Sequence, residues 1–598
     1  MNNQVVYNIA EICARHGITE VVISPGSRSA PLLLAFARHP AFRGRIKVVP
    51  DERAAAFIGL GLALATGRPT VLVCTSGSAG LNYAPAVAEA YFQQVPLLVL
   101  TADRPPEWID QLDGQTIRQQ NLYGRHAKGS FDFPVDTAHP DAKWFAERVI
   151  NEAINLSQAA PAGPVQVNVP LREPFYPKAG EVVEYEAGVK IMREQAATAR
   201  LELADVASLR QQLQAASRVL VVAGQQPADA ALTSALARFA KAWQAVVVAD
   251  SLANLDGVPT VRSHDVFLAG LTSANKQELK PDLLITFGLS LISKSLKLFL
   301  REAAPRQHWH VQAGDAATDT FKSLTRLIRV TPAVFFRQLA ALKNESRVGP
   351  DGSNPSASAE LGQGSNPVVN SLTHPWQWAD VAAADFLINF FDRTGQPFNE
   401  FSSFYRVLAA LPGQTALHLA NSMAVRYANI LGLPQQRQIE VFANRGTSGI
   451  DGCTSTAVGY ALARPAQPVV LLTGDVAFFY DRNAFWHNYP LPNLRVVVFN
   501  NHGGGIFRII DGPRQQPELD EFFETRQALT AENLCRDFQL RYFLVASFAE
   551  LDRALPEFFA AETGAAVLEI RTDSRSNAAF FEQYRLAVKA AWAGAASG

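Results

Sequence analysis

Two stretches of the chain decide its fold: VVLLTGD at residues 469–475 and LRVVVFNN at residues 494–501. Each begins as an apolar run rich in β-branched residues and ends in polar ones, which is typical of a buried parallel strand and the loop that follows it. The chain between them has the length of one helical crossover, so the two strands are predicted neighbours in one sheet. Their polar ends should meet at one edge of that sheet, where such folds bind ligands.

The same pattern recurs along the whole chain, with alanine-rich helical stretches between the apolar runs. Strands that alternate with helices predict parallel sheets covered on both faces. We therefore expect an α/β protein with three doubly wound parallel-sheet domains. The strands predicted are 21–23, 47–49, 71–73, 97–100 and 165–169 in the first, 218–222, 283–287 and 308–311 in the second, and 416–419, 439–441, 469–472, 494–499 and 566–570 in the third.

Composition places the domain boundaries. Residues 346–372 are rich in Gly, Ser, Asn and Pro and lack hydrophobic periodicity, which indicates an exposed linker. We predict domains at 1–178, 179–345 and 396–598, with a linker at 346–395. In the second domain the segment 223–227 is not a G-x-G-x-x-G motif, so a Rossmann-like spacer is expected there and a dinucleotide site is not.

The charge balance limits the partners. The chain has 54 basic and 55 acidic residues and a net charge of −1, which argues against general binding to nucleic acid. It has neither a secretory signal pattern nor an apolar run long enough to span a membrane. Its 4 cysteines are scattered, which favours a reducing, cytoplasmic location over a disulfide framework or a structural zinc site.

The polar ends of the two deciding stretches suit a metal ion that bridges phosphates. Gly474-Asp475 and Asn500-Asn501 offer carboxylate and amide oxygens, the hard donors that Mg²⁺ and Ca²⁺ prefer. Gly474 allows close backbone approach, and the N–H groups of a helix beginning at Asp475 could bind a diphosphate oxygen. Either half alone is better explained by a helix-capping aspartate or an Asn-Asn turn. Together, after adjacent strands, they favour the metal-bridged diphosphate.

Gly474-Asp475 followed by Asn500-Asn501 resembles the motif of the thiamine-diphosphate-dependent superfamily related to pyruvate decarboxylase. The resemblance implies a pyrimidine-binding first domain, a central Rossmann-like domain and a diphosphate-binding third domain. It implies thiamine diphosphate as the cofactor, with Mg²⁺ (or Mn²⁺) held by the Asp475 carboxylate, the Asn501 amide oxygen and the Gly503 carbonyl. The cofactor-binding residues that it implies are Gly474, Asp475, Val476, Asn501, Ile450 and Ser422.

Glu52, in Asp51-Glu52-Arg53, precedes a predicted helix at 54–65. A carboxylate at this position is commonly just a favourable partner of the helix dipole. The resemblance implies that Glu52 is the catalytic residue, bonded to the aminopyrimidine ring of a cofactor that the opposite subunit holds. It implies that Ile450 supports the bent cofactor. A homodimer or a tetramer is therefore expected.

Longer segments resemble one family within the superfamily, the 2-succinyl-5-enolpyruvyl-6-hydroxy-3-cyclohexene-1-carboxylate synthases of menaquinone biosynthesis. The implied activity is that of a transferase: decarboxylation of 2-oxoglutarate and addition of the succinyl semialdehyde carbanion to isochorismate. The segments that carry this resemblance are 24–32, 101–107, 420–426, 444–452 and 503–507.

Both implied substrates carry carboxylates, which guanidinium groups bind bidentately. Arg28, Arg104, Arg426 and Arg445 lie in the matching segments, although for any one arginine a surface ion pair is the commoner outcome. Where the family's central domain can carry a Lys-Arg pair, this chain has Lys294-Ser295, which puts that contact in doubt. The predicted substrate-binding residues are Ser27, Arg28, Arg104, Gln115, Lys294, Ser422, Arg426, Arg445, Ile506 and Phe507.

Two rival functions remain at this point. One is another thiamine-diphosphate enzyme of the same fold, such as an acetolactate-synthase-like carboligase or a 2-oxoacid decarboxylase. The other is a catalytically silent cofactor-binding or regulatory protein, against which Glu52, Asp475 and Asn501 argue.

Overall fold

The structure is a computed structural model that describes residues 3–594 except 179, 196, 315, 341–373, 394 and 561–563. It has two compact units. The first consists of Met1–Ala197, Pro397–Ala428 and Leu433–Glu582, and the second of Thr198–Gln396, Asn429–Gly432 and Gln583–Gly598. Among the described residues, no helix has the length and apolar character needed to cross a membrane.

The first unit contains two six-stranded parallel sheets with the same strand order, β2-β1-β3-β4-β6-β5 and β13-β12-β14-β15-β17-β16. The strands are β1 Val21–Ile23, β2 Ile46–Val48, β3 Thr70–Cys74, β4 Leu97–Asp103, β5 Gly129–Asp132, β6 Pro164–Pro170, β12 Ala416–Leu419, β13 Glu440–Phe442, β14 Val469–Gly474, β15 Leu494–Asn500, β16 Arg541–Val545 and β17 Ala566–Arg571.

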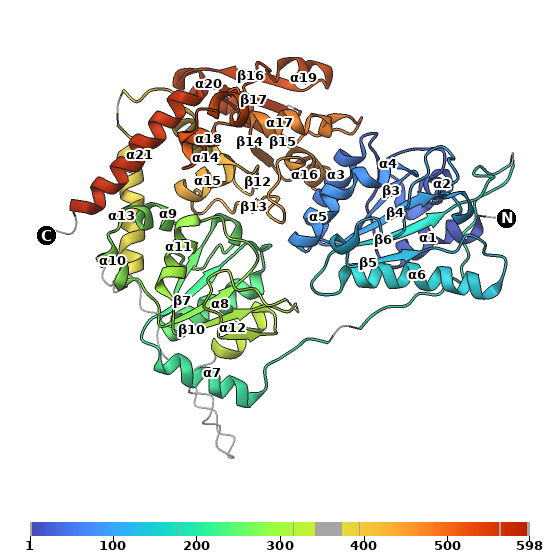
Figure 1. The fold of residues 1–598 in the computed structure, drawn as a ribbon, viewed down its shortest axis with the longest axis horizontal. Coiled ribbons are helices and arrows are strands. Elements are labelled where there is room, and N and C mark those ends of the chain that lie inside the picture. Colours follow the sequence, from blue (N-terminus) through green and yellow to red (C-terminus); the bar gives the residue numbers. More distant parts are fainter. Residues whose placement is uncertain are drawn as a thin grey trace, which may run out of the picture. The chain divides into compact units, whose positions relative to one another are not determined.

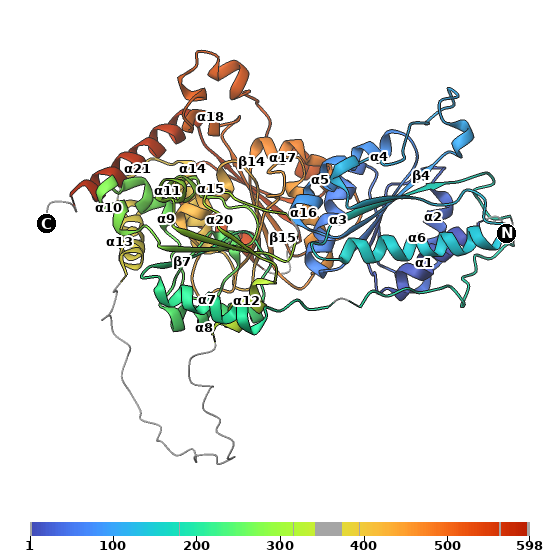
Figure 2. The same ribbon diagram turned by 60° about the horizontal axis from the view of Figure 1, so that its bottom comes forward.

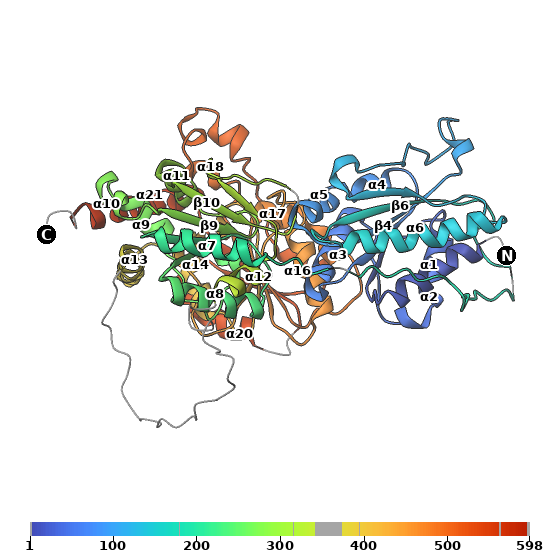
Figure 3. The ribbon, with the colours of Figure 1, turned by 90° about the horizontal axis from the view of Figure 1, so that it is seen from below.

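Helices cover both faces of these sheets because their strands are apolar on both sides (Figure 3). The helices associated with the first sheet are α1 Gln4–Arg15, α2 Ala30–Arg38, α3 Glu52–Thr66, α4 Ser78–Asn82, α5 Ala84–Gln93 and α6 Pro140–Gln158. Those around the other sheet are α14 Glu400–Ala410, α15 Met423–Leu431, α16 Cys453–Ala463, α17 Asp475–Tyr480, α18 Ile506–Ile509, α19 Glu532–Asp537, α20 Phe548–Phe559 and α21 Ser574–Gly594.

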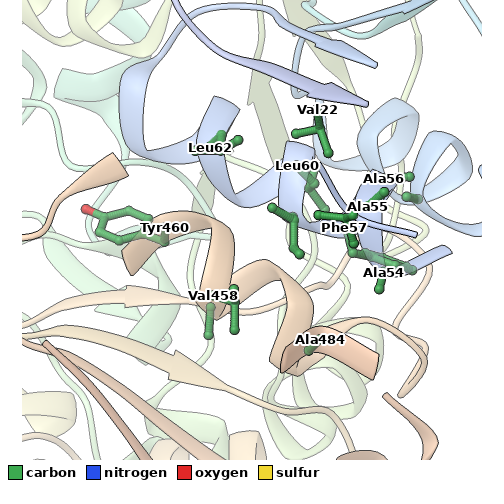
Figure 4. Packing of buried hydrophobic residues seen from close by; sticks show 14 of the residues in the cluster. Val22, Ala54, Ala55, Ala56, Phe57, Leu60, Leu62, Val458, Tyr460 and Ala484 are labelled. Carbon is green, nitrogen blue, oxygen red and sulfur yellow. The ribbon is translucent and has the colours of Figure 1, made fainter. Parts of the chain in front are cut away.

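The two sheets of this unit meet through α3 and α16, which lie side by side (Figures 1 and 4). Both helices are apolar almost all round, so each can be buried between its own sheet and the other helix. Glycines bring the two backbones into contact. A Cβ on Gly61 would lie 2.0 Å from the Thr456 carbonyl oxygen, and one on Gly459 would lie 2.0 Å from that of Ile58.

The second unit has a five-stranded parallel sheet in the order β11-β10-β9-β7-β8, with a core of its own (Figure 2). Its strands are β7 Val219–Ala223, β8 Val246–Ala249, β9 Leu283–Phe287, β10 Gln307–Val311 and β11 Arg326–Ile328. Its helices are α7 Leu203–Ala215, α8 Ala230–Trp243, α9 His264–Gly270, α10 Ser273–Glu278, α11 Lys294–Ala303, α12 Pro332–Ala340 and α13 Pro375–Phe391.

The α/β class and all thirteen predicted strands are confirmed, to within a residue or two at their ends except for the longer β4 and β14. The linker prediction is wrong for residues 375–391, which form α13. Its Trp376 is buried and donates an indole hydrogen bond of 2.9 Å to the Leu279 carbonyl. The rest of the predicted linker lies largely outside the described residues. Four strands, β5, β8, β11 and β16, were not predicted.

Candidate active site

Gly474-Asp475 and Asn500-Asn501, called the metal motif below, lie where expected, at the carboxyl ends of two adjacent parallel strands. Gly474 ends β14 opposite Phe499 of β15, and Asp475 begins α17. The Asp475 side chain is buried and its Oδ2 accepts a hydrogen bond of 2.6 Å from Gln527 Nε2. Burial raises the pKa of Asp475 to about 6, against the bonds from Gln527 and nearby backbone N–H groups, which lower it.

Asn501 directs its amide oxygen into the protein without a partner. Its Nδ2 donates a hydrogen bond of 2.7 Å to Glu400 Oε2. Its Oδ1 is buried, and none of the described residues donates to it. A buried carbonyl oxygen without a donor is costly for the apoprotein, and it suits a hard cation.

Asn500 is bonded differently, although it is the adjacent residue. Its Nδ2 donates to Glu569 Oε1 at 2.6 Å, and its Oδ1 accepts from the backbone N–H of His502 at 3.0 Å. Both ends of this amide are therefore occupied within the fold. Of the two asparagines, Asn501 is the one whose oxygen could bind a metal.

The remaining features of the motif also fit a metal-bound diphosphate. The backbone N–H of Gly503 bonds to Asp475, and its carbonyl accepts one bond of 3.0 Å from Gly505. That carbonyl has a second lone pair for a metal. A Cβ on Gly474 would meet nothing within 4 Å, so the backbone there is open to a ligand. No group of three His, Cys, Asp or Glu side chains that could hold a metal occurs among the described residues.

Glu52 is the first residue of α3 and is half-buried. The preceding Asp51 caps the helix by accepting from the N–H of Arg53 at 2.9 Å. The same carboxylate accepts a bond of 2.7 Å from Asn483 Nδ2, and Arg53 donates to the Tyr480 carbonyl at 2.8 Å. Tyr480 is the last residue of α17, the helix that begins at Asp475. These bonds therefore hold the start of α3 against the metal motif.

Asn421 links the loop that carries Ile450 to Arg445, a predicted substrate residue. The Asn421 amide donates to the Gly449 carbonyl at 2.6 Å, and Arg445 donates to Asn421 Oδ1 at 3.0 Å. Ile450 packs against the small apolar cluster of Ala420, Cys453 and Ala477, of which Ala477 belongs to α17. Ile450 therefore lies beside the metal motif.

The other predicted residues of this sheet lie in two places. Ser422 has a positive φ of 75° after β12, and its carbonyl accepts from Arg426. Ile506 and Phe507 begin the short α18, and the Phe507 ring lies 5.9 Å from that of Phe523. Both are half-buried, so neither is committed to the core.

The predicted residues of the first sheet gather on its strand-end loops. Ser27 is exposed, whereas Arg28 is buried, donates to the Leu171 carbonyl at 2.9 Å and stacks on Phe175. Gln115 has a positive φ of 57°, and its backbone passes Gly77.

Of the two remaining predicted residues, Arg104 directly follows β4 on these loops, and Lys294 lies in the second unit. Arg104 pairs with Asp113 at 3.2 Å and donates to the Gly114 carbonyl. Lys294 begins α11 in the second unit, where it is exposed.

Several polar residues of the site had no sequence signal. Glu400 and Gln527 hold the two metal-motif side chains, and Glu89 accepts from the backbone N–H groups of Gly446 and Thr447 at 2.7 Å. Glu400 begins a helix behind Asn399 and resembles an ordinary acidic first-turn residue. Only the fold brings these side chains to the motif.

Three family models match the chain in order. The N-terminal TPP binding domain of thiamine pyrophosphate enzymes matches residues 4–123, their middle domain 191–419, and their C-terminal TPP binding domain 423–570.

Relatives match over nearly the full length. The chain is 46% identical to the 2-succinyl-5-enolpyruvyl-6-hydroxy-3-cyclohexene-1-carboxylate synthase of Cytophaga hutchinsonii over 98% of this chain and 99% of that one. It is 37% identical to the synthase of the same name from Porphyromonas gingivalis, over 95% and 94%. Among solved structures, a thiamine diphosphate-dependent 4-hydroxybenzoylformate decarboxylase of Rhodococcus jostii RHA1 superposes with a TM-score of 0.66 at 20% identity, over 95% of this chain and 99% of that one. This last likeness concerns the fold alone.

Proposed function

The chain belongs to the family of thiamine-diphosphate-dependent 2-succinyl-5-enolpyruvyl-6-hydroxy-3-cyclohexene-1-carboxylate synthases, and on that premise we propose how its residues carry out the reaction. The enzyme decarboxylates 2-oxoglutarate and joins the remaining four-carbon unit to isochorismate, a step of menaquinone biosynthesis. The observation that carries the site assignment is the buried, unpartnered Oδ1 of Asn501 beside Asp475.

Bound thiamine diphosphate supplies the carbon nucleophile and the electron sink that decarboxylation requires. In our proposal Asp475, the Asn501 amide oxygen and the Gly503 carbonyl hold Mg²⁺ (or Mn²⁺), which neutralises the diphosphate. The backbone of Gly474 and Val476 binds the diphosphate at the start of α17, where the helix dipole favours an anion. Ile450, beside Ala477, would support the bound cofactor.

Glu52 is proposed to exchange a proton with the aminopyrimidine ring. Its carboxylate has no hydrogen bond or ion pair among the residues that the structure describes, so it is available to a ligand. Asp51 satisfies the N-terminal N–H groups of α3 in its place. This division of labour leaves Glu52 free for chemistry although it begins a helix.

Carboxylate recognition is assigned to the arginines. Arg445 lies on the loop that leads to Ile450, Arg426 lies near the start of α15 beside Ser422, and Arg104 lies on the first sheet's loops. Two or more guanidiniums suit polycarboxylate substrates. For Arg28, stacking on Phe175 also makes a purely structural contribution. Roles for Ser27, Gln115, Lys294, Ile506 and Phe507 stay predictions.

The proposed assembly is a homodimer in which the first sheet's domain completes the partner's site. Within this chain α3, which carries Glu52, packs on α16, which belongs to the domain that carries Asp475. No helix or strand is described between β6 and α7, so the first domain is tethered by an irregular segment. A contact between domains tethered in this way can form equally well between two copies of a chain, as in domain swapping. The four buried free cysteines suit the cytoplasm, which we propose as the location.

A coupled assay tests the activity. Purified enzyme with thiamine diphosphate and Mg²⁺ should release CO₂ from 2-oxoglutarate in proportion to the isochorismate supplied. CO₂ release at the same rate without isochorismate would identify a simple 2-oxoacid decarboxylase instead.

A further inference from the structure

Two adjacent asparagines at the end of β15 each donate their amide to a buried carboxylate. Asn501 Nδ2 lies 2.7 Å from Glu400 Oε2, and Asn500 Nδ2 lies 2.6 Å from Glu569 Oε1. Asn500 Nδ2 also donates to the Leu529 carbonyl at 3.0 Å, and the two amides differ most at their oxygens. The oxygen of Asn500 accepts from a backbone N–H, whereas that of Asn501 is buried and has no donor among the described residues.

The partner of Asn501 determines which way its amide faces. The NH₂ group of Asn501 faces Glu400, because Glu400 Oε2 accepts its hydrogen bond. The carbonyl oxygen then points the opposite way, and burial of that oxygen without a donor costs folding free energy in the metal-free protein. Such a cost is offset when a cation binds the oxygen.

Glu400 is itself held in place from two sides. It begins α14, whose N-terminus is capped by Asn399 through a bond of 2.9 Å from the Ser402 N–H. Asn577 of α21 accepts from the Glu400 backbone N–H at 2.9 Å and donates to Glu400 Oε2 at 3.2 Å. The carboxylate is therefore held by Asn577 of α21 at the start of α14, and the same Oε2 accepts the bond from Asn501 after β15.

From this geometry we propose that Glu400, held by Asn577, is a positioning residue that presents the Asn501 oxygen to the metal ion. The inference rests on the proposed function, which makes Asn501 a ligand. Glu400 lies far from the metal motif in sequence, and its proposed role is to orient one metal ligand, Asn501. Residues that orient ligands from behind typically contribute 10- to 100-fold to metal affinity.

The test measures metal binding without turnover. Mn²⁺ is titrated into the full-length protein with saturating thiamine diphosphate, and free Mn²⁺ is followed by its EPR signal. Glu400→Ala should weaken Mn²⁺ binding about 10- to 100-fold. Glu400→Gln should weaken it less, because its amide oxygen can still accept from Asn501. Should Glu400→Ala fail to fold, the near-isosteric Glu400→Gln carries the comparison alone.

Glu569→Gln is the matched control, since it alters the equally buried carboxylate that holds Asn500. It should lower the thermal midpoint and leave Mn²⁺ affinity within about threefold of wild type, because Asn500 is not a ligand. Wild-type affinity in both Glu400 variants, or equal losses in Gln and Ala, would overturn the positioning role; equal losses would indicate an effect of charge alone. If Asn501→Ala abolishes binding while the Glu400 variants keep it, only this inference fails. If the wild type binds no Mn²⁺, the proposed site fails as well.

Discussion

The carboxylate of Asp51 accepts a hydrogen bond of 2.7 Å from the side-chain amide of Asn483, and this bond joins the helix that carries Glu52 to the domain that carries Asp475. Asn483 lies in the short turn Arg482–Phe485 that follows α17. Asn483 bonds to Asp51 Oδ2, and the other oxygen, Oδ1, caps α3. The Asp51 carboxylate thus fixes both the start of α3 and the position of that helix relative to the metal motif.

Asn483→Ala should lower kcat about 10-fold or more with little loss of stability, because small misplacements of a catalytic group are costly. Asp51→Ala should lower kcat similarly and also destabilise the protein by about 0.5–2 kcal/mol through loss of the cap. Asp229, which caps α8 in the second unit with a bond of 2.8 Å to the Ala231 N–H, provides the control. Asp229→Ala should cost comparable stability and leave kcat unchanged. Full activity in Asn483→Ala would contradict the role of this bond.

Glu52→Gln should reduce turnover about 10²- to 10⁴-fold, because an amide replaces the carboxyl group that exchanges the proton. Binding of thiamine diphosphate and Mg²⁺, followed by calorimetry, should persist. Glu532, the exposed first residue of α19, is a matched helix-start glutamate. Glu532→Gln should be fully active, and wild-type turnover in Glu52→Gln would remove Glu52 from the mechanism.

Asp481 should make stability depend on pH. Its side chain accepts from the N–H and hydroxyl of Ser455 at 2.6 and 2.7 Å. Burial nevertheless raises its pKa to about 7. Between the ordinary carboxyl pKa of about 4 and this value the unfolded chain loses the proton first, so the contribution of Asp481 to stability falls as pH rises, by up to about 1.4 kcal/mol per pH unit.

Asp481→Asn removes this titration. The thermal midpoint of the variant minus that of the wild type should therefore increase between pH 5 and pH 8. Other titrating groups are common to both proteins and cancel in the difference. A difference that is the same at both pH values would mean that Asp481 does not titrate in this range.

Mixed variants decide whether a site takes its halves from one chain or two. Glu52→Gln and Asp475→Ala are each expected to be inactive. If sites form between subunits, refolding the two together in equal amounts restores one intact site in each hybrid dimer, or about a quarter of wild-type activity. We predict this recovery. No recovery from verified hybrids would place Glu52 and Asp475 of one chain in the same site.

The central features of fold and site follow from the sequence because they depend on local pattern. Strands such as β14 and β15 are buried on both faces, so nearly every residue before the polar loop is apolar, Arg495 being the exception. The strands missed, β5, β11 and β16, are edge strands with mixed burial and a weaker pattern. β8 is a plain apolar run, Val246–Ala249, and could have been predicted.

The unpredicted part of the site depends on long-range contacts. Glu400 and Gln527 reach the motif, and Asn483 reaches Asp51, only after the first unit has folded. Nothing in their local sequence distinguishes them from surface residues. The helix at 375–391 follows a low-complexity segment and was assigned to it, although Trp376 and its neighbours are apolar. The burial of a strand can thus be predicted from its local sequence, whereas hydrogen bonds between side chains distant in sequence cannot.

Product analysis tests the central claim most directly. Enzyme, thiamine diphosphate, Mg²⁺, isochorismate and ¹³C-labelled 2-oxoglutarate are incubated, and the products are identified by mass spectrometry and NMR, with Glu52→Gln in parallel. We predict one adduct in which the four carbons that remain of 2-oxoglutarate are bonded to the isochorismate ring, absent with Glu52→Gln. Labelled succinic semialdehyde as the sole product, with isochorismate unchanged, would contradict the account.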